Sequence, residues 1–499
     1  MLYVGIDLGT SAVKLVLMNE IGQVLGSVSE EYKLSFPHDG WSEQNPEDWF
    51  EMTIKGLKEL LSKEEMHDVR AIGIAGQMHG LVTLDALDRV IRPAILWNDG
   101  RSQVETRYLN EEFGVDNLVK ETGNIAFAGF MAPKILWMKH HEPELFARIN
   151  KIMLPKDYLV YRMTGEFTTD ASDAAGMLLM DVEHRKYSQK MLDLCGINEN
   201  MLPKIYESYE VVGRLRPEIK DLLGFDSNQS IIMAAGAGDN AAAAVGTGII
   251  SGIKGIEAED SCNCNISLGT SGTIFVANKD YVDVPGHGLH SFAHSDGSYA
   301  LLGCMLSAAS CNTWWMDNIL NSSDYKSEQG KIDVASLGEN SVFFLPYLIG
   351  ERCPHNDPRV RGGFFGLSLN TTRADITQAI LEGVCFGIRD SIELAKAAGV
   401  TINMSRICGG GAKSELWKKM MASVLRIPLQ RVECEEGPGF GGAILAAVAD
   451  GLFSSVDEAV SKVVRVSEVT NYNEELACKY DERYQKYKEL YPAVREFYK

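Results

Sequence analysis

A glycine-containing turn between two apolar runs occurs twice in this chain, about half its length apart, and this repeat constrains the fold more than any other feature. The first copy is GIDLGTS, residues 5–11, and the second is SLGTSGT, residues 267–273. An apolar run on each side of such a turn predicts a β-hairpin. Chance recurrence of a common strand–turn tetrapeptide is the alternative, but two copies between apolar strands favour two domains built on one plan.

The two copies differ in chemistry at the end of the first strand. Asp7 stands there in the first copy and Ser267 in the second. A lone buried carboxylate is costly, so Asp7 predicts a cation or a donor nearby. Backbone N–H groups and hydroxyls of the turns can bind phosphate, and Lys14 on the return strand can add a positive charge. We therefore interpret Asp7 as a metal-facing carboxylate and the second turn as a neutral phosphate cradle.

Composition excludes several classes of partner. The formal net charge of −20 disfavours nucleic acid or an anionic membrane surface as a general partner. No uninterrupted apolar span approaches about 18 residues, so we predict no membrane helix. The N-terminal apolar run contains Asp7 and lacks a basic segment before it, so we expect no signal peptide. The ten cysteines form no CxxC pair, which predicts a cytoplasmic protein with free thiols and no zinc site.

Polar clusters follow apolar strands in the first half, where α/β proteins bind ligands. The turn at 76–80 carries Gln77, Met78 and His79, and the apolar residues 95–96 lead to Trp97 and Asp99. Trp97 could line the site of a small polar ligand, while Asp99 and Arg101 pair with each other or with that ligand. The plainer interpretations are a hydrogen-bonded loop histidine and a surface turn with a half-buried tryptophan.

Two further stretches of small polar or histidine-containing sequence are predicted to be irregular. Residues 155–176 indicate a loop and a short strand near a cleft, with Ser172 and Asp173 as weaker site candidates. The glycines around His287, His290 and His294 favour a loop, and we do not expect a metal there.

A strand at 231–235, a glycine turn and a small-residue helix place Asp239 at a helix N-terminus, which favours its charged form. A carboxylate there is a suitable general base, although a plain helix cap is the common use of such a residue. We place a domain boundary near residues 249–262.

The second half contains a long helix from Thr372 to about Gly399, a strand at 405–408 and then three consecutive glycines at 409–411. A helix follows from about Ser414, and a triple glycine at this junction lets a ligand lie against the backbone. From about residue 474 the tail is predicted to be helical. Its tyrosine stripe is expected to pack on the second domain rather than on another copy of the chain, and consists of Tyr480, Tyr484, Tyr487 and Tyr491.

No GxxxxGK[ST] is present, so a P-loop is not indicated, and we do not expect a Rossmann site. Two similar halves that each open on a phosphate-binding hairpin are the plan of the actin-like ATPase group. The predicted fold class is therefore α/β, with two actin-like ATPase (ribonuclease H-like) domains and an interdomain cleft for nucleotide. Residues 1–248 would bind sugar and carry the first hairpin, and residues 249–499 would bind nucleotide and carry the helical tail.

At this point the chain resembles a known family, the FGGY carbohydrate kinases, and within it the bacterial members that phosphorylate xylulose. The resemblance covers most of the chain to about residue 450, and SGIKGIEAED (251–260) looks like a short insertion. Among the matching motifs are GIDLGTSAVK (5–14), GIAGQMHG (73–80), RPAILWNDGR (92–101), GDNAAAAVG (238–246), SLGTSG (267–272), FLPYLIGERCPHNDP (344–358) and GGGAKSELW (409–417).

The resemblance implies MgATP-dependent phosphorylation of D-xylulose at its 5-hydroxyl, with Asp239 as the general base and Asp7 holding Mg²⁺. The sugar would be bound by Gln77, Met78, His79, Trp97, Asp99 and Asn240. The phosphates of ATP would be bound by Gly9, Thr10, Ser11, Lys14, Gly269, Thr270 and Ser271, and the adenosine by Gly409, Gly410, Gly411 and Ser414.

Rival interpretations within the family are kinases of ribulose, fuculose, gluconate or glycerol. A rival from another class is an actin-like ATPase that acts as a chaperone or assembly protein. The expected partners are a small sugar and ATP, without nucleic acid or membrane, and the sequence leaves a homodimer open.

Overall fold

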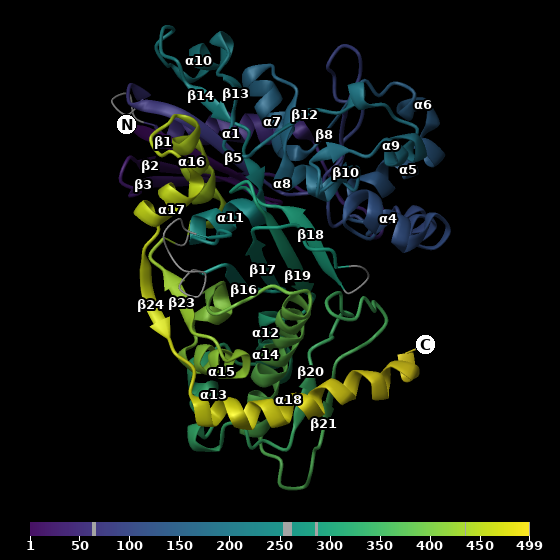
Figure 1. Cartoon of the computed structure of the whole chain (residues 1–499), viewed down its shortest axis with the longest axis vertical. Coiled ribbons are helices and arrows are strands. Elements are labelled where there is room, and N and C mark those ends of the chain that lie inside the picture. The colour runs from purple at the N-terminus through teal and green to yellow at the C-terminus, as the bar shows by residue number, and fades with distance from the viewer. Residues whose placement is uncertain (62–65, 253–261, 285–287, 435, 499) are drawn as a thin grey trace.

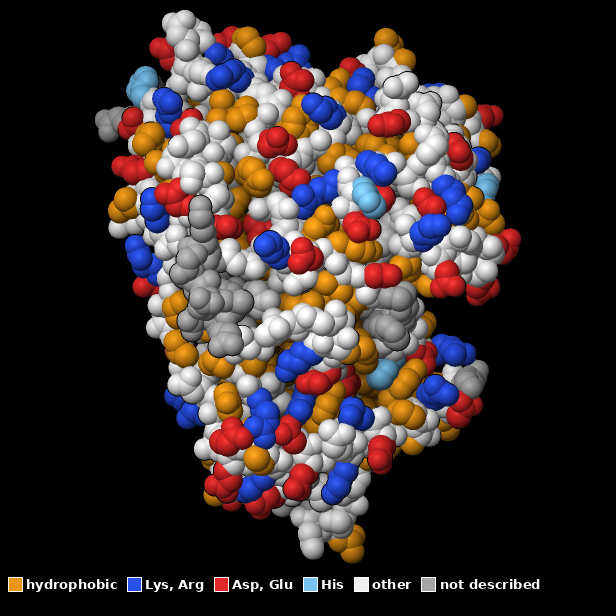
Figure 2. Space-filling view, in the orientation of Figure 1, with side chains coloured by type: hydrophobic (Ala, Val, Ile, Leu, Met, Phe, Trp, Pro, Cys, Tyr) orange, Lys and Arg blue, Asp and Glu red, His pale blue; other side chains and the backbone are white. Residues whose placement is uncertain are grey.

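The computed structural model describes residues 1–61, 66–252, 262–284, 288–434 and 436–498. Two lobes lie one above the other, each built on its own seven-stranded sheet (Figure 1). We call them the N-terminal lobe and the C-terminal lobe after the strands that form their centres. Figure 2 shows acidic and basic side chains interspersed over one face of both lobes.

The N-terminal sheet begins with a three-strand antiparallel meander and continues with parallel strands, except that the edge strand β13 pairs antiparallel with β14. Its order is β13-β14-β5-β1-β2-β3, and β15 pairs with the end of β5. The strands are β1 (Leu2–Leu8), β2 (Ala12–Asn19), β3 (Val24–Glu31), β5 (Val69–Gly76), β13 (Val211–Arg214), β14 (Ile232–Ala234) and β15 (Ala237–Gly238).

The C-terminal sheet repeats this plan. Its order is β18-β19-β17-β16-β22-β23-β24, and β16 has an antiparallel neighbour in β17 and a parallel one in β22, as β1 has in β2 and β5. The two-domain prediction from the repeated turn is thus confirmed at the level of strand pairing. The strands are β16 (Cys264–Leu268), β17 (Gly272–Asn278), β18 (Leu289–Ala293), β19 (Tyr299–Met305), β22 (Ser405–Cys408), β23 (Leu429–Val432) and β24 (Val466–Thr470).

Helices cover both faces of the N-terminal sheet. Leu15 and Val16 are consecutive in β2 and therefore point to opposite faces. A Cβ on Gly56 would lie 2.5 Å from Leu15 Cδ1, and one on Gly439 would lie 3.0 Å from Val16 Cγ2. The helices concerned are α1 (Pro46–Leu60) on the first face and α16 (Gly437–Ala449) on the second, beside α11 (Asp239–Thr247).

Helix α16 comes late in the chain but belongs to the N-terminal lobe. Its residues share a buried core with Tyr3 and Met18, and α17 (Val456–Val463) contributes to the same core. The chain thus returns to the N-terminal lobe for residues 437–463 and then leaves again along β24 (Figure 1). The division of the chain at residues 248 and 249 stays a prediction, and it leaves this returning segment on the other side of the cut.

The tail helix α18 (Glu474–Val494) packs on the C-terminal lobe, as expected. Tyr480, Tyr484 and Tyr487 are buried in the core of that lobe, and Tyr491 packs against it. Other helices of this lobe are α12 (Ala309–Trp314), α13 (Tyr325–Gln329), α14 (Arg373–Ala397) and α15 (Glu415–Leu425), and its smaller sheet contains β20 (Phe343–Leu345) and β21 (Gly363–Phe365).

Two predictions of irregular structure are wrong. Residues 155–176 contain α7 (Pro155–Thr164), β9 (Thr168–Asp170) and α8 (Ala171–Ala174). Helix α7 is buried on most of its circumference, so its sequence lacks the one-sided apolar period that reveals a surface helix. Residues 289–293 form β18 rather than a loop, because the glycine turn ends at Gly288. His287 and most of the expected insertion at 251–260 lie outside the described residues.

The remaining elements of the N-terminal lobe connect these parts and surround the polar clusters. They are β4 (Glu43–Gln44), β6 (Val82–Leu84), β7 (Ala94–Ile95), α3 (Gln103–Arg107), α4 (Val115–Thr122), α5 (Met131–His141), α6 (Pro143–Phe146), β8 (Lys151–Met153), β10 (Met180–Asp181), β11 (Lys186–Tyr187), α9 (Gln189–Cys195), β12 (Lys204–Tyr206) and α10 (Pro217–Leu223). Within the described parts of the chain, no helix has the length and apolar character needed to cross a membrane. All ten cysteines are free.

Candidate active site

The predicted phosphate hairpin and the predicted base meet at one edge of the N-terminal sheet. Leu8 at the end of β1 pairs with Gly76 at the end of β5, and Gly76 pairs in turn with Gly238 of β15. Asp239 follows directly as the first residue of α11. The carboxyl ends of three parallel strands thus bring Asp7, the turn at 76–80 and Asp239 together, at the place where such sheets bind ligands.

Asp7 and Asp239 are close enough to influence each other's charge. Burial, then the negative charge of Asp239, raise the pKa of Asp7 to about 7, while Lys14 opposes the shift. Burial raises the pKa of Asp239 to about 6. Asn240 opposes that shift, because its backbone N–H and side-chain amide donate to Asp239 Oδ1 at 2.7 and 2.9 Å. No donor among the described residues contacts the other oxygen, Oδ2, so its lone pairs are available to a substrate.

The residues around Asp7 fit a magnesium ion most of whose ligands are oxygens of water and phosphate. In the described part of the chain, no group of three or more His, Cys, Asp or Glu side chains could hold a metal. Mg²⁺ needs no such cage, since one or two carboxylates with water and phosphate oxygens suffice. A cation would also relieve the repulsion from Asp239, which after burial is the next cause of the raised pKa of Asp7.

Side chains of other elements donate hydrogen bonds to the first hairpin turn. Gln44 Nε2 donates to the Thr10 carbonyl at 2.7 Å and Trp97 Nε1 donates to Thr10 Oγ1 at 2.9 Å. Gln77 Nε2 lies 3.4 Å from the Gly9 carbonyl. Gln77 and Trp97, predicted to bind sugar, therefore support the phosphate turn in this structure.

Lys14 has a partner outside the hairpin. Its Nζ lies 2.6 Å from Glu436 Oε2, just before α16. A phosphate bound at the first turn would compete with Glu436 for this ammonium group.

His79 occupies a left-handed backbone conformation, with φ of +69°. Its Nδ1 lies 2.9 Å from the Gly176 carbonyl, which can only accept, so Nδ1 carries the proton. Burial lowers the pKa of His79 to about 3, so the ring is neutral and its Nε2 can accept a hydrogen bond from a hydroxyl. Met78 is buried beside Asn240, with its sulfur 3.9 Å from Asn240 Nδ2.

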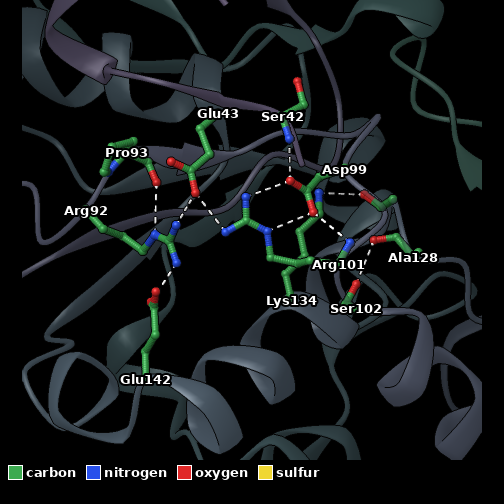
Figure 3. Close-up of polar contacts among 11 residues, drawn as sticks. Ser42, Glu43, Arg92, Pro93, Asp99, Arg101, Ser102, Ala128, Lys134 and Glu142 are labelled. Carbon is green, nitrogen blue, oxygen red and sulfur yellow. Dashed lines mark hydrogen bonds and ion pairs between the residues drawn. The ribbon is translucent and has the colours of Figure 1, made fainter. Parts of the chain in front are cut away.

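Asp99 is fully engaged in an ion-pair network (Figure 3). Its Oδ1 accepts from the Arg101 backbone N–H and Nε at 2.9 and 2.8 Å, and its Oδ2 accepts from Ser42 N and Arg101 Nη2 at 2.6 and 2.7 Å. The Arg101 guanidinium also pairs with Glu43 at 2.7 Å and lies over the Trp41 ring. These bonds fill the four acceptor positions of Asp99, so direct binding of sugar by this carboxylate is a prediction that the geometry does not support. Of the two pairings that the sequence leaves open, Asp99 makes the one with Arg101.

Two buried lysines near the candidate site were not among the residues predicted from the sequence. Lys134 Nζ donates to the carbonyls of His79 and Gly129 at 3.0 and 2.7 Å, so it stabilises the turn that carries His79. Lys156 is buried among three aspartates under the turns of both His79 and Asp239. Lys134 stands in the otherwise apolar run MAPKILW, and Lys156 stands beside Asp157 in the mostly apolar run MLPKDYLV. A charge within an apolar run was the signal that could have revealed them.

The three glycines lie against the second hairpin. A Cβ on Gly409, whose φ is +88°, would lie 2.7 Å from the Leu268 carbonyl, so only glycine fits there. A cavity of about 770 Å³ is lined in part by Gly410, Gly411 and Ser414. A second cavity of about 480 Å³ is lined by Asp239 and Ser267 and also by Gly409 and Gly410. Gly410 and Lys413 line both cavities, so the predicted adenosine turn lies next to the cavity that Asp239 lines.

Comparison with known proteins places this geometry in context. The model for the N-terminal domain of the FGGY family of carbohydrate kinases matches residues 2–246, and the model for the C-terminal domain matches residues 264–449. The xylulose kinase of Escherichia coli (strain K12) is 42% identical over 450 residues, which are 90% of this chain and 90% of that protein. The xylulose kinase of Bacillus subtilis (strain 168) is 36% identical over 497 residues, 99% of this chain and 97% of that one.

Solved structures show the same architecture over the whole chain. The structure titled a xyloylose kinase from Brucella ovis has a TM-score of 0.92 and 38% identity, and covers 100% of both chains. A gluconate kinase from Lactobacillus acidophilus has a TM-score of 0.90 and 25% identity, and covers 100% of this chain and 99% of that one. The fold is therefore shared by proteins whose names specify different sugars.

Proposed function

Because this chain belongs to the FGGY family of carbohydrate kinases, we propose that it transfers the terminal phosphate of ATP to the 5-hydroxyl of D-xylulose. The relatives at 36–42% identity described above are xylulose kinases, which supports this acceptor. The observation that carries the mechanism is Asp239, whose Oδ2 has no donor from the described residues and which borders the cleft shared with the glycine turn.

Asp239 is the proposed general base. Its raised pKa, about 6, leaves it ionised at neutral pH and makes it a stronger proton acceptor than an ordinary aspartate. Asn240 fixes the carboxylate through Oδ1, so Oδ2 faces the substrate. Oδ2 would accept the proton of the sugar hydroxyl as the hydroxyl oxygen bonds to the terminal phosphorus of ATP and the bond between that phosphorus and ADP breaks.

The sugar is proposed to lie against Met78, His79 and Asn240. The neutral His79 ring would accept a hydrogen bond from a sugar hydroxyl through Nε2, because Nδ1 is committed to Gly176. Gln77 and Trp97 would support the predicted phosphate-binding turn, so their role would not be limited to contact with the sugar.

The phosphates of ATP are proposed to lie between the two hairpin turns, and the adenosine in the larger cavity beside Gly410, Gly411 and Ser414. Asp7 would hold Mg²⁺, which when bound supplies charge neutralisation for phosphoryl transfer. This chemistry needs little covalent help from the protein, so orientation of the hydroxyl and exclusion of water are the main tasks of these residues. We place the reaction in the cytoplasm, a location compatible with ten free cysteines.

A coupled ADP-release assay across ketoses, polyols and sugar acids tests this proposal. D-xylulose should give the highest kcat/KM, and a higher value with ribulose, fuculose, gluconate or glycerol would reassign the acceptor. An actin-like ATPase of the chaperone or assembly class would instead release ADP at a rate that no sugar changes.

The role of Asp239 is tested by Asp239→Ala. We expect a loss of about two or more orders of magnitude in turnover, with D-xylulose still bound in calorimetry. Turnover close to that of the unaltered enzyme would exclude Asp239 as the base.

A further inference from the structure

Beneath the candidate site lies a fully buried cluster of one lysine and three aspartates. Lys156 Nζ lies 2.7 Å from Asp157 Oδ1 and 2.8 Å from Asp170 Oδ1, but 3.9 Å from Asp173 Oδ2, and all four side chains are inaccessible to solvent. Burying such charges costs more than it returns unless each is paired, so a cluster of this kind is poor evidence for stability alone.

The cluster reaches the Asp239 turn through one hydroxyl. Asp170 Oδ2 accepts from the backbone N–H of Ser172 at 2.8 Å and from its Oγ at 2.5 Å. The hydroxyl proton of Ser172 is thereby committed to Asp170, so a lone pair of Oγ remains for the Gly238 backbone N–H, 3.1 Å away. Gly238 directly precedes Asp239 and is the N-cap residue of α11.

Lys156 also touches the other side of the site. A Cβ on Gly76 would lie 2.9 Å from Lys156 Cβ, so the lysine stem packs directly under the strand end that leads to Met78 and His79. The chain of contacts from Lys156 through Asp170 and Ser172 therefore fixes the Asp239 turn relative to the proposed sugar-binding turn. A carboxylate that must meet one hydroxyl in line with phosphorus needs this kind of fixation, because a displacement of about 1 Å can cost a hundredfold in rate.

We propose that Ser172 is a positioning residue for Asp239, and that the buried pair of Lys156 and Asp170 orients its hydroxyl. The proposal deepens the proposed function and rests on it, since it assumes that Asp239 is the base.

Ser208 supplies a matched control for Ser172. Its hydroxyl also donates to Asp170 Oδ2, at 2.7 Å, and both serines are 1% exposed. Only Ser172 accepts from Gly238. Ser172→Ala and Ser208→Ala thus remove equivalent donors from Asp170, but only the first removes an acceptor from the turn of Asp239.

The experiment measures kcat, the KM for each substrate and thermal unfolding for both variants. We expect Ser172→Ala to lower kcat about tenfold with little change in the KM for ATP, and Ser208→Ala to keep kcat within about twofold. Both should unfold at similar temperatures, because each loses one hydroxyl. Equal kcat values for the two variants would overturn the proposal.

A double-mutant cycle with Asp239→Ala gives the decisive readout. If Ser172 acts through Asp239, adding Ser172→Ala to Asp239→Ala should cause no further loss of turnover. A full additional tenfold loss would show that Ser172 acts elsewhere and would overturn the proposal. Failure of the proposed function is distinguishable, because in that case Asp239→Ala alone would leave turnover almost unchanged.

Discussion

At the scale of single residues, burial gives Asp239 and Asp7 their chemistry and also makes them costly. The pKa of each carboxyl is raised, to about 6 and about 7, chiefly because burial disfavours the charged form. The same shift that makes Asp239 a better base therefore stores unfavourable energy in the protein without ligands. Stability and activity should respond in opposite directions when either charge is removed.

Asp7→Asn should accordingly stabilise the ligand-free protein at alkaline pH. A folded pKa of about 7 against an ordinary aspartate value of 3.8 means that the folded state keeps a proton that the unfolded chain releases, so stability falls as pH rises toward 7 and stays lower above it. We expect Asp7→Asn to be more stable than the natural protein at pH 8 by about 1–3 kcal/mol, with a smaller difference at pH 5. Thermal unfolding at the two pH values measures this. Asp39→Asn, at an exposed position, is the control, and no gain for Asp7→Asn at pH 8 would contradict the account.

His79→Asn should weaken sugar binding more than nucleotide binding. Asparagine tolerates the left-handed backbone at this position, so the change removes the ring without forcing the turn to rearrange. Loss of one hydrogen bond predicts a rise of about tenfold in the KM for D-xylulose, with the KM for ATP nearly constant. Steady-state kinetics with each substrate varied decide the matter, and a larger effect on ATP would move the sugar elsewhere. His141→Asn, at an exposed position in α5, serves as the control.

At the scale of elements, the close contact of α16 with the N-terminal sheet depends on glycine at both surfaces. A Cβ on Gly5 would lie 1.8 Å from the Gly439 carbonyl oxygen, and one on Gly73 would lie 2.1 Å from that of Gly442. The returning segment can therefore lie against β1 and β5 almost backbone to backbone. This packing holds the strand ends that carry the site.

Gly73→Ala should destabilise the protein, because the new methyl group would collide with the backbone of α16. Overpacking of this kind costs about 1–3 kcal/mol or more. Gly26→Ala, on β3 of the same sheet, is the control, since its Cβ would meet only Leu60 Cδ1 at an ordinary 3.6 Å. Chemical denaturation of both variants gives the comparison, and equal unfolding free energies would refute the close-packing argument.

Elements whose signals are local could be predicted from the sequence. The two hairpins, the start of α11 at Asp239 and the start of α15 near Ser414 depend on turn glycines and helix-start residues a few positions away. Helix α7 could not be predicted in this way because it is buried on most sides. The return of α16 was equally hidden, since an apolar GPGFGGAILAAVA does not specify which sheet it covers.

The grouping of the candidate site residues could also be predicted from local signals, and also only in part. Met78, His79, Asn240 and Asp239 stand at strand or helix ends and do come together. Asp99 was predicted to bind the sugar. Its hydrogen bonds are made instead to Ser42 and Arg101, and no local sequence pattern reveals these partners. The buried contacts of Lys156 join positions far apart in the chain, so they emerge only when the fold is assembled.

At the scale of the whole molecule, the chain passes between the lobes three times on one side. These crossings are the connections from α11 to β16, from β23 to α16 and from α17 to β24 (Figure 1). The two lobes also touch directly, because β18 of the C-terminal lobe contacts α8 of the N-terminal lobe. A hinge motion between the lobes would narrow the cavity of about 480 Å³, because Asp239 of the N-terminal lobe and Ser267 of the C-terminal lobe both line it.

Closure of the lobes is the expected consequence, because water competes with the sugar as acceptor unless it is excluded. Small-angle scattering should give a smaller radius of gyration with D-xylulose, Mg²⁺ and a non-hydrolysable ATP analogue together than with no ligand. Asp239→Ala should contract to the same extent, since the base is needed for proton transfer and not for binding. Identical scattering with and without ligands would contradict closure, and the exclusion of water would then have to come from the static walls of the two cavities that meet at Gly410 and Lys413.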